Sequence, residues 1–392
     1  MRILSYTFIF LGILLLIPLT GFAWDYPLSL DITKVSFNYT GNGVAITLRK
    51  NNGENIISAP EWYANPGGEI LRNDHFAFIK GDVPAGVKAS FASSNPDPTE
   101  SVEIAVDTCS ATSGDGFENY TGWSLNNGTI TFPSGPLETE GTFNTHNGTS
   151  VKSSVGKCRT KFLWKIVKVN GTAYSQDIGY TIHDYYTLLS SPSSFAYYTY
   201  NETGIPWTDA LDLACGWASG QTTREGCIPL LTDSLYNYSK IKYIDQNKGY
   251  FAPYDTNILY FKVLLDSLDN QNETKLDCYA LSSFLNVLSY SIGFPFYNNA
   301  TIKLTPSSSI ITNSIRPAHW TYDETFTWGA HQIISFIDSY YSEYVADPSA
   351  KVYQNGSLIL AKGDITYNTY LPLLTSSSVT KGSRAQTYIY HP

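Results

Sequence analysis

The stretch KLDCYALSSFLNVLSYSIGFP, residues 275–295, has the spacing of apolar residues that an amphipathic helix requires. Asp277 is a preferred N-cap residue, and Gly293 followed by Pro295 is typical of a helix C-terminus. The stretch therefore predicts a helix that begins at Cys278 and carries one apolar stripe, formed by Leu281, Phe284, Leu285, Leu288 and Ile292.

The cysteine at the start of this helix is a candidate nucleophile. A thiol in the first helical turn lies at the positive end of the helix dipole, close to backbone N–H groups that lack a helical partner. We therefore expect the pKa of Cys278 to be lowered. A buried structural cysteine is the alternative, because Cys278 precedes Leu281 and Leu285 on the apolar stripe by three and seven residues.

The N-terminal residues predict export. An apolar run over residues 8–17 follows Arg2, and the small residues Gly21 and Ala23 come after it, as before a signal-peptidase cleavage site. A membrane-spanning helix is the alternative, but the run is shorter than the ~20 residues that a bilayer requires. We expect residues 1–23 to be a signal peptide and the remaining chain to be secreted or at the extracellular surface, with no membrane span.

The composition narrows the classes of partner. The formal net charge is -9 and the sequence has no cluster of Lys and Arg, which argues against a nucleic-acid partner and an anionic membrane. No His and Cys residues have the spacing of metal ligands, so we expect neither a metal nor another cofactor. The 30 Tyr, 19 Phe and 8 Trp residues indicate a β-rich secreted protein, with a sugar-binding surface as the alternative.

The sequence also contains ten Asn-x-Ser/Thr triplets, the acceptor motif for N-glycosylation. This is about twice the number expected by chance for this composition, which is consistent with a secreted glycoprotein. The candidate acceptors are Asn38, Asn119, Asn127, Asn147, Asn170, Asn201, Asn237, Asn272, Asn299 and Asn355.

The five cysteines leave at least one thiol unpaired within the chain. Cys109 and Cys158 both lie in the N-terminal half, while Cys215 and Cys227 flank a short loop between two expected helices. We expect these two pairs to form disulfides in an oxidising compartment. Cys278 is then left as the free thiol, although five cysteines allow other pairings.

Residues 24–190 are predicted to form an antiparallel β-sandwich of the immunoglobulin-like type, because they contain short alternating runs separated by turn residues. The Asn-Gly pair at 170–171 is a typical hairpin turn. The run before it would place Trp164 and Ile166 on one face of its strand. The other clear runs are KVSFNY, VAITLRK, HFAFIK, VKASFAS and SVEIAVDT.

Residues 191–206 are rich in Ser, Pro and Gly, which indicates a linker between two domains. Beyond it the apolar spacing becomes helical, with Thr208 as a candidate N-cap and Gly220 as a candidate C-terminal residue. A second helix is expected to begin near Pro229. We assign residues 207–392 to a second domain, because the mature chain exceeds the length that one core usually supports.

A cysteine nucleophile needs a histidine to accept its proton and a group that orients the histidine. His331 begins the first of two β-type runs that a turn at Ser339 would join. A hairpin centred on Ser339 places Asp347 directly opposite His331, within reach of its imidazole. The inference depends on register, since a slip of one residue would move the two side chains to opposite faces. His319 is the alternative histidine, but no carboxylate is comparably placed for it.

The order and spacing of these residues resemble the transglutaminase-like superfamily. An Asp-Cys pair opens an apolar helix that ends in Gly-Phe-Pro, a strand beginning with His331 follows, and an Asp-Pro pair comes sixteen residues after it. The resemblance covers roughly residues 206–353. It implies a papain-like α+β fold, in which Cys278 lies on the helix and His331 and Asp347 lie on adjacent strands.

The resemblance also implies acyl transfer on protein or peptide amides outside the cell, through a triad of Cys278, His331 and Asp347. Water as the acceptor would make the protein a protease or amidase, and a lysine amine would make it a crosslinking transglutaminase. The family usually has Gly before the Asp-Cys pair and a polar residue after it, whereas Leu276 and Tyr279 stand there in this chain. An inactive surface-associated binding or structural protein that retains the fold is the competing hypothesis.

Overall fold

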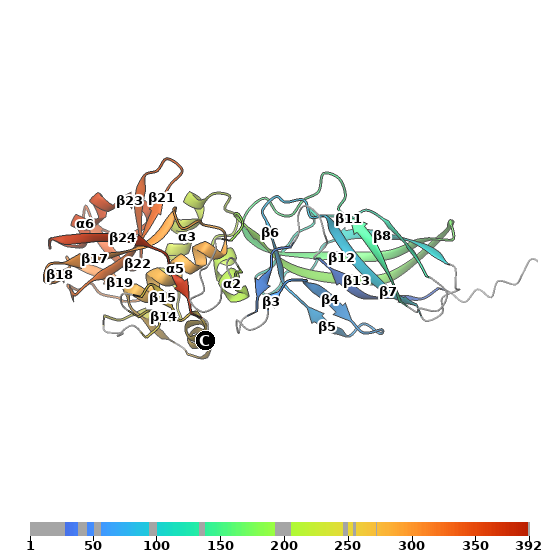
Figure 1. Cartoon of the computed structure of the whole chain (residues 1–392), viewed down its shortest axis with the longest axis horizontal. Helices are drawn as coiled ribbons and strands as arrows, with labels where there is room; N and C mark the ends of the chain where they lie inside the picture. Colours follow the sequence, from blue (N-terminus) through green and yellow to red (C-terminus); the bar gives the residue numbers. More distant parts are fainter. Residues whose placement is uncertain are drawn as a thin grey trace, which may run out of the picture.

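The protein is a mixed α+β structure rich in strands, and it consists of two lobes that lie end to end (Figure 1). We call residues 28–192 the N-terminal lobe and residues 205–390 the C-terminal lobe. The expected signal peptide lies outside the described residues. Within the described part of the chain, no helix has the length and apolar character needed to cross a membrane. This computed structural model describes residues 28–37, 45–50, 56–93, 100–132, 138–192, 205–245, 250–253, 256–271 and 273–390.

Two sheets make up most of the N-terminal lobe. The first has the strand order β11-β7-β1-β4-β5, and all of its neighbouring strands are antiparallel. Two short strands, β2 (Leu48–Arg49) and β3 (Ile56–Ile57), pair separately. The strands of the first sheet are β1 (Leu30–Ser36), β4 (Glu61–Ala64), β5 (Ile70–Asn73), β7 (Gly86–Ser93) and β11 (Glu138–Asn144).

The second sheet has the order β10-β8-β12-β13-β6, and β9 also pairs with β12. The pairs β13·β6 and β12·β9 are parallel, so the prediction of a wholly antiparallel lobe is wrong for them. Period-two alternation determines which face a residue occupies and does not determine the direction of the neighbouring strand. The strands are β6 (Phe76–Ile79), β8 (Ser101–Cys109), β9 (Glu118–Asn119), β10 (Gly128–Thr131), β12 (Gly156–Val169) and β13 (Thr172–Leu188).

A core of aromatic and branched side chains lies between the two sheets. Along β12, Phe162, Trp164 and Ile166 are fully buried while the residues between them are partly exposed, which confirms the predicted faces. The indole N–H of Trp164 donates to Thr181 Oγ1 at 3.0 Å, so its polar atom is satisfied inside the core. The hairpin between β12 and β13 turns at Asn170, whose φ of 49° is in the left-handed region.

An antiparallel sheet with the order β19-β22-β21-β17-β24 forms the centre of the C-terminal lobe, and β23 also pairs with β22. Its strands are β17 (Asn299–Pro306), β19 (Ile315–Pro317), β21 (His331–Ile337), β22 (Glu343–Gln354), β23 (Ser357–Thr366) and β24 (Val379–Ala385). Three small ladders join β14 (Ile241–Tyr243) to β16 (Thr274–Leu276), β15 (Ile258–Leu259) to β25 (Tyr388–Ile389), and β18 (Ile310–Ile311) to β20 (Thr327–Trp328).

Helix α5 (Cys278–Ser291) packs against β21, β22 and β17 and is buried on all sides. It begins and ends as predicted, since Asp277 caps it and Gly293, at φ 99°, follows its end. Helix α2 (Thr208–Trp217) starts after Trp207, so Thr208 is not its N-cap. The other helices are α3 (Arg224–Tyr236), α4 (Phe261–Asn270) and α6 (Tyr367–Leu374).

The predicted start of α3 near Pro229 is wrong, because the helix begins five residues earlier. The side chain of Thr223 accepts a hydrogen bond from the Gly226 N–H at 3.1 Å and so caps the first turn. Pro229 lies inside the helix, five residues beyond the first helical position that proline prefers.

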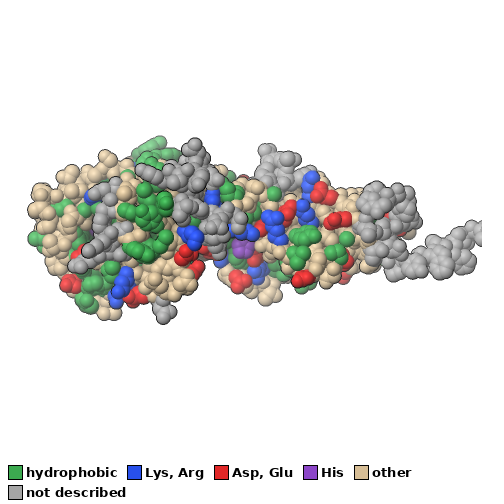
Figure 2. Space-filling model, turned by 60° about the horizontal axis from the view of Figure 1, so that its bottom comes forward, with side chains coloured by type: hydrophobic (Ala, Val, Ile, Leu, Met, Phe, Trp, Pro, Cys, Tyr) green, Lys and Arg blue, Asp and Glu red, His purple; other side chains and the backbone are tan. Residues whose placement is uncertain are grey.

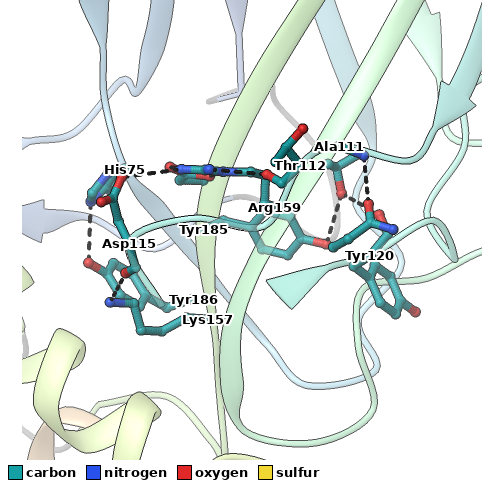
Figure 3. Close-up of polar contacts among 12 residues, drawn as sticks. His75, Ala111, Thr112, Asp115, Tyr120, Lys157, Arg159, Tyr185 and Tyr186 are labelled. Carbon is teal, nitrogen blue, oxygen red and sulfur yellow. Dashed lines mark hydrogen bonds and ion pairs between the residues drawn. The ribbon is translucent and has the colours of Figure 1, made fainter. Parts of the chain in front are cut away.

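Polar side chains join the two lobes. The Tyr186 hydroxyl lies 3.2 Å from the ring nitrogen of His75 (Figure 3) and donates to Asp212 on α2 at 3.1 Å. Lys157 of β12 also pairs with Asp212, at 2.6 Å. Acidic and basic side chains are interspersed on the face of the N-terminal lobe seen in Figure 2. The predicted linker, 191–206, lies mostly outside the described residues.

All five cysteines are free thiols in the structure, so neither predicted disulfide is present. Cys109 on β8 stands opposite Lys161 on β12, three residues and about 10 Å along the strand from Cys158. Cys158 points into the core, whereas Cys109 lies on the other face of the sheet with Lys161. This separation and direction exclude a Cys109–Cys158 bond without movement of the backbone.

Cys215 and Cys227 lie on α2 and α3 and are both fully buried. The sulfur of Cys215 is 4.0 Å from the carbonyl oxygen of Thr187 on β13, so its side chain faces the N-terminal lobe. Burial raises the pKa of both thiols, to about 12 for Cys227. The short separation of Cys215 and Cys227 in the sequence therefore did not predict how they pack: each is a buried free thiol on its own helix.

One predicted glycosylation site is contradicted by its burial. Asn299 is fully buried, and its side-chain amide donates to Asn286 Oδ1 at 2.8 Å. A glycan requires an exposed asparagine, so Asn299 is not an acceptor in the folded protein. Asn38, Asn201 and Asn272 lie outside the described residues. The exposed candidates are Asn119, Asn127, Asn147, Asn170, Asn237 and Asn355.

The buried histidine His183 makes the N-terminal lobe sensitive to acid. Burial lowers its pKa from the ordinary value of 6.5 to about 3. Below pH 6.5 the unfolded chain therefore binds a proton that the folded chain excludes, and stability falls as pH decreases from about 6.5 to about 3. We predict that His183→Gln removes about 1.4 kcal/mol per pH unit from the pH dependence of the unfolding free energy.

Urea unfolding between pH 7 and pH 4 checks this prediction, with His146→Gln as the control, since His146 is exposed. Equal pH slopes for wild type and His183→Gln would contradict it.

Candidate active site

Cys278 is the first residue of α5 and lies in the wall of a cavity of about 460 Å³. The Oδ1 atom of Asp277 accepts a hydrogen bond from the Ala280 N–H at 2.9 Å, which fixes the first turn of the helix. The cavity wall combines aromatic rings, two carboxylates and one amine. Its residues are Tyr243, Asp245, Asp277, Cys278, Tyr279, Lys303, Thr327, Trp328, Gly329 and Ala330.

His331 and Asp347 form a buried pair behind this cavity. They lie on the adjacent strands β21 and β22, and the Nε2 atom of His331 is 2.8 Å from Oδ2 of Asp347. Neither residue has any solvent exposure. A carboxylate in this place holds the proton on Nε2 and leaves Nδ1 as the basic nitrogen.

The register that joins these strands differs from the predicted one. Ile334 pairs with Ala346, so the hairpin is centred on Tyr340 and not on Ser339. Asp338 causes this shift, because its carboxylate accepts the backbone N–H groups of two turn residues, Tyr340 and Ser342, and widens the turn.

The prediction that Asp347 stands directly opposite His331 is therefore wrong. Extending the observed register places Asp347 opposite Ile333, diagonally next to His331. The change is an even number of residues, so both side chains remain on the same face of the sheet. A diagonal neighbour is still within reach of an imidazole, as the 2.8 Å contact shows.

Further donors surround the carboxylate of Asp347. Its Oδ1 atom accepts hydrogen bonds from the backbone N–H and the hydroxyl of Ser349, and its Oδ2 atom also accepts from the Tyr370 hydroxyl. Burial favours the neutral acid, but the charge and hydrogen bond of His331 and the hydroxyls of Ser349 and Tyr370 outweigh it and lower the pKa of Asp347. The carboxylate therefore stays ionised although it is fully buried.

The second ring nitrogen of His331, Nδ1, is buried and makes no hydrogen bond with the residues that the structure describes. The indole of Trp328 stacks on the imidazole, with 4.4 Å between ring centroids and 15° between planes. Trp328 also lines the cavity that contains Cys278. A buried imidazole nitrogen without a hydrogen-bond partner is unusual.

The start of α5 is attached to the strand that carries His331. The Ser282 hydroxyl donates to the main-chain oxygen of Gln332 at 2.7 Å, and the Gln332 amide donates to the Ser283 hydroxyl at 3.3 Å. The main-chain N–H of Gln332 also interacts with Cys278 and favours its thiolate. These contacts place the thiol next to Gln332, the residue that follows His331 on β21.

The expected decrease in the pKa of Cys278 is not found. Burial raises its pKa well above the ordinary value, and the nearby carboxylates of Asp277, Asp347 and Asp245 raise it further. The helix N-terminus and the Gln332 N–H do not compensate for this. The resting thiol is therefore protonated and needs a base to become a nucleophile.

His319, the alternative histidine, is exposed, and it bonds to no carboxylate in the part of the chain that the structure describes. No group of three or more His, Cys, Asp or Glu side chains within the described ranges is arranged to hold a metal ion. Sequence reasoning did not find Trp328 or Tyr370, because an aromatic residue in a β-rich chain gives no signal of its neighbours.

The comparisons with known proteins give no further assignment. No protein-family model matches this chain, and no curated protein matches it either.

We predict that Asp347→Ala destabilises the protein by about 3 to 5 kcal/mol, because it leaves His331, Ser349 and Tyr370 buried without their acceptor. Denaturant unfolding measures the change. The control is Asp323→Ala in the same lobe, which removes a pair of 2.7 Å with the partly exposed Arg316 and a hydrogen bond from the exposed Tyr353 hydroxyl, and it should cost much less. Similar losses for the two variants would contradict this account of the buried pair.

Proposed function

We propose that the protein is an acyl-transfer enzyme of the transglutaminase-like type, in which Cys278 is the nucleophile, His331 the general base and Asp347 the group that orients the base. The observation that carries this proposal is the buried His331–Asp347 contact of 2.8 Å, in which Nδ1 of His331 has no hydrogen-bond partner among the described residues and the imidazole stacks on Trp328, a residue of the cavity wall that also contains Cys278. A histidine oriented in this way matches the role of the base in a nucleophile–base–orienter set.

The proposal includes a papain-like fold for the C-terminal lobe and an immunoglobulin-like fold for the N-terminal lobe. A helix that carries the cysteine and packs on strands that carry histidine and aspartate supports a papain-like C-terminal domain. Two sheets around a common aromatic core support an immunoglobulin-like N-terminal domain. Leu276 and Tyr279, which differ from the usual family residues, are both buried next to the nucleophile.

The raised pKa of Cys278 determines how the chemistry would proceed. The thiol transfers its proton to Nδ1 of His331 while its sulfur attacks the carbonyl carbon of an amide. Backbone N–H groups at the start of α5 stabilise the resulting oxyanion. The imidazolium then gives the proton to the leaving amine, and a thioester remains on Cys278. Water or a lysine amine resolves the thioester, giving hydrolysis or transamidation.

An extracellular setting completes the proposal. The expected signal peptide and the six exposed Asn-x-Ser/Thr sites support a secreted glycoprotein that meets protein or peptide substrates outside the cell.

A second candidate function is a binding or structural protein without catalysis. The observation that favours it is the thiol itself, which is only 5% exposed and has a raised pKa. In that case His331 and Asp347 would serve only to stabilise the lobe.

We predict that iodoacetamide labels Cys278 at pH 7 at least tenfold more slowly in His331→Gln than in the wild type, because the imidazole is the proposed acceptor of the thiol proton. Peptide mapping by mass spectrometry follows the rate. Cys109, the one partly exposed thiol of the five, serves as the internal control and should react equally in both proteins. Equal labelling of Cys278 would favour the binding protein.

We also predict that Cys278→Ala abolishes amide hydrolysis and transamidation while the protein stays folded. Alanine fits the start of a helix, whereas no other group can form the thioester. A panel of glutamine-containing and general peptide substrates tests activity, and circular dichroism tests folding. Wild-type turnover by this variant on a substrate of the native protein would exclude Cys278 as the nucleophile.

A further inference from the structure

Tyr370 reaches the candidate active site from a segment that the sequence resemblance does not include. It lies on α6, after β23, and has no solvent exposure. Its hydroxyl donates to Oδ2 of Asp347, the same oxygen that lies 2.8 Å from Nε2 of His331. One carboxylate oxygen is therefore shared between the imidazole and the phenol.

The phenol acts only as a donor in this arrangement. Burial and the charge of Asp347 raise the pKa of Tyr370 well above its usual range, so its hydroxyl keeps its proton. A protonated phenol donates one hydrogen bond, and Asp347 is the acceptor that receives it. The hydrogen bond from Tyr370 therefore stabilises the ionised form of the Asp347 carboxylate.

The helix that carries Tyr370 is held firmly against the sheet. The side chain of Thr366 caps its first turn by accepting the N–H of Thr369, and Leu374 is buried at its other end. Helix α6 packs on both β22, which carries Asp347, and β23. The position of the phenol is thus fixed by two strands and a cap.

We propose that Tyr370 is a positioning residue of the active site, which holds the Asp347 carboxylate in the orientation that keeps a proton on Nε2 of His331 and leaves Nδ1 free to take the proton of Cys278. This inference rests on the proposed function, since it assigns a fourth residue to that same site. No proton moves to or from Tyr370 during the reaction.

Loss of the phenol hydroxyl should change the pH dependence in one direction. The buried Asp347 carboxylate would lose a donor, and burial would then raise its pKa. The ionised carboxylate that has lost this donor is a stronger hydrogen-bond acceptor for Nε2 of His331, so the His331–Asp347 pair holds its protons to a higher pH. The acidic limb of Cys278 labelling should therefore move up. The other titratable groups that face Asp347 are Cys278 on α5, Tyr236 on α3 and Tyr243 on β14.

The test is the rate of Cys278 alkylation by iodoacetamide between pH 5 and pH 9 in the full-length protein. In Tyr370→Phe we expect the acidic limb of this profile to move up by about one pH unit, which corresponds to about 1.4 kcal/mol. The matched control is Tyr290→Phe, which removes a fully buried phenol that donates to the Asn299 carbonyl oxygen at 3.0 Å. Tyr290 is twelve residues, or about 18 Å, along α5 from Cys278.

The outcomes separate this inference from the proposed function. A His331→Gln variant that labels like the wild type would overturn the proposed function itself. A His331-dependent profile that does not move in Tyr370→Phe, or moves equally in Tyr290→Phe, would overturn only the role of Tyr370.

A second variant covers the case in which Tyr370→Phe does not fold. Incorporation of 3,5-difluorotyrosine at position 370 makes the phenol a stronger donor in the same place. We expect the acidic limb of the labelling profile to move to lower pH in this protein, and an unchanged or raised limb would overturn the inference.

Discussion

The buried hydrogen bond between His331 and Asp347 sets the requirements that the rest of the C-terminal lobe meets. An ionised carboxylate without exposure costs several kcal/mol unless donors surround it. Here the donors come from three separate elements, namely His331 on β21, Ser349 on β22 and Tyr370 on α6. The register of the β21–β22 hairpin and the position of α6 must therefore both bring their donors to the carboxylate of Asp347.

Both ends of α5, the helix that carries the candidate nucleophile, are fixed. Asp277 caps its start, and at its end the N–H groups of Leu189 and Ser190 donate to the carbonyl oxygen of Ile292. Gly293 is required there, because a Cβ atom would lie 2.3 Å from the Ser190 oxygen at a φ of 99°. The two residues that follow β13 thus hold the end of the helix of the candidate active site, and the N-terminal lobe contributes to the placement of Cys278.

Local signals in the sequence predicted helix α5, the Asn170 turn and the shared face of His331 and Asp347, because caps, turn residues and alternation are properties of neighbouring residues. The centre of the hairpin was missed because the side chain of Asp338 widens the turn. Three predictions failed because they depend on packing between distant segments, which the spacing of residues does not encode. These are the two disulfides, the glycosylation of Asn299 and the lowered pKa of Cys278.

The central claim is that the free nitrogen of His331 faces the sulfur of Cys278 closely enough to take its proton. A crystal structure at pH 7 measures this separation directly. The account predicts a distance of about 4 Å between the sulfur and Nδ1, because catalytic contacts are often loose before substrate binds. A distance beyond about 7 Å, with both side chains well ordered, would contradict a catalytic pair and leave the binding function.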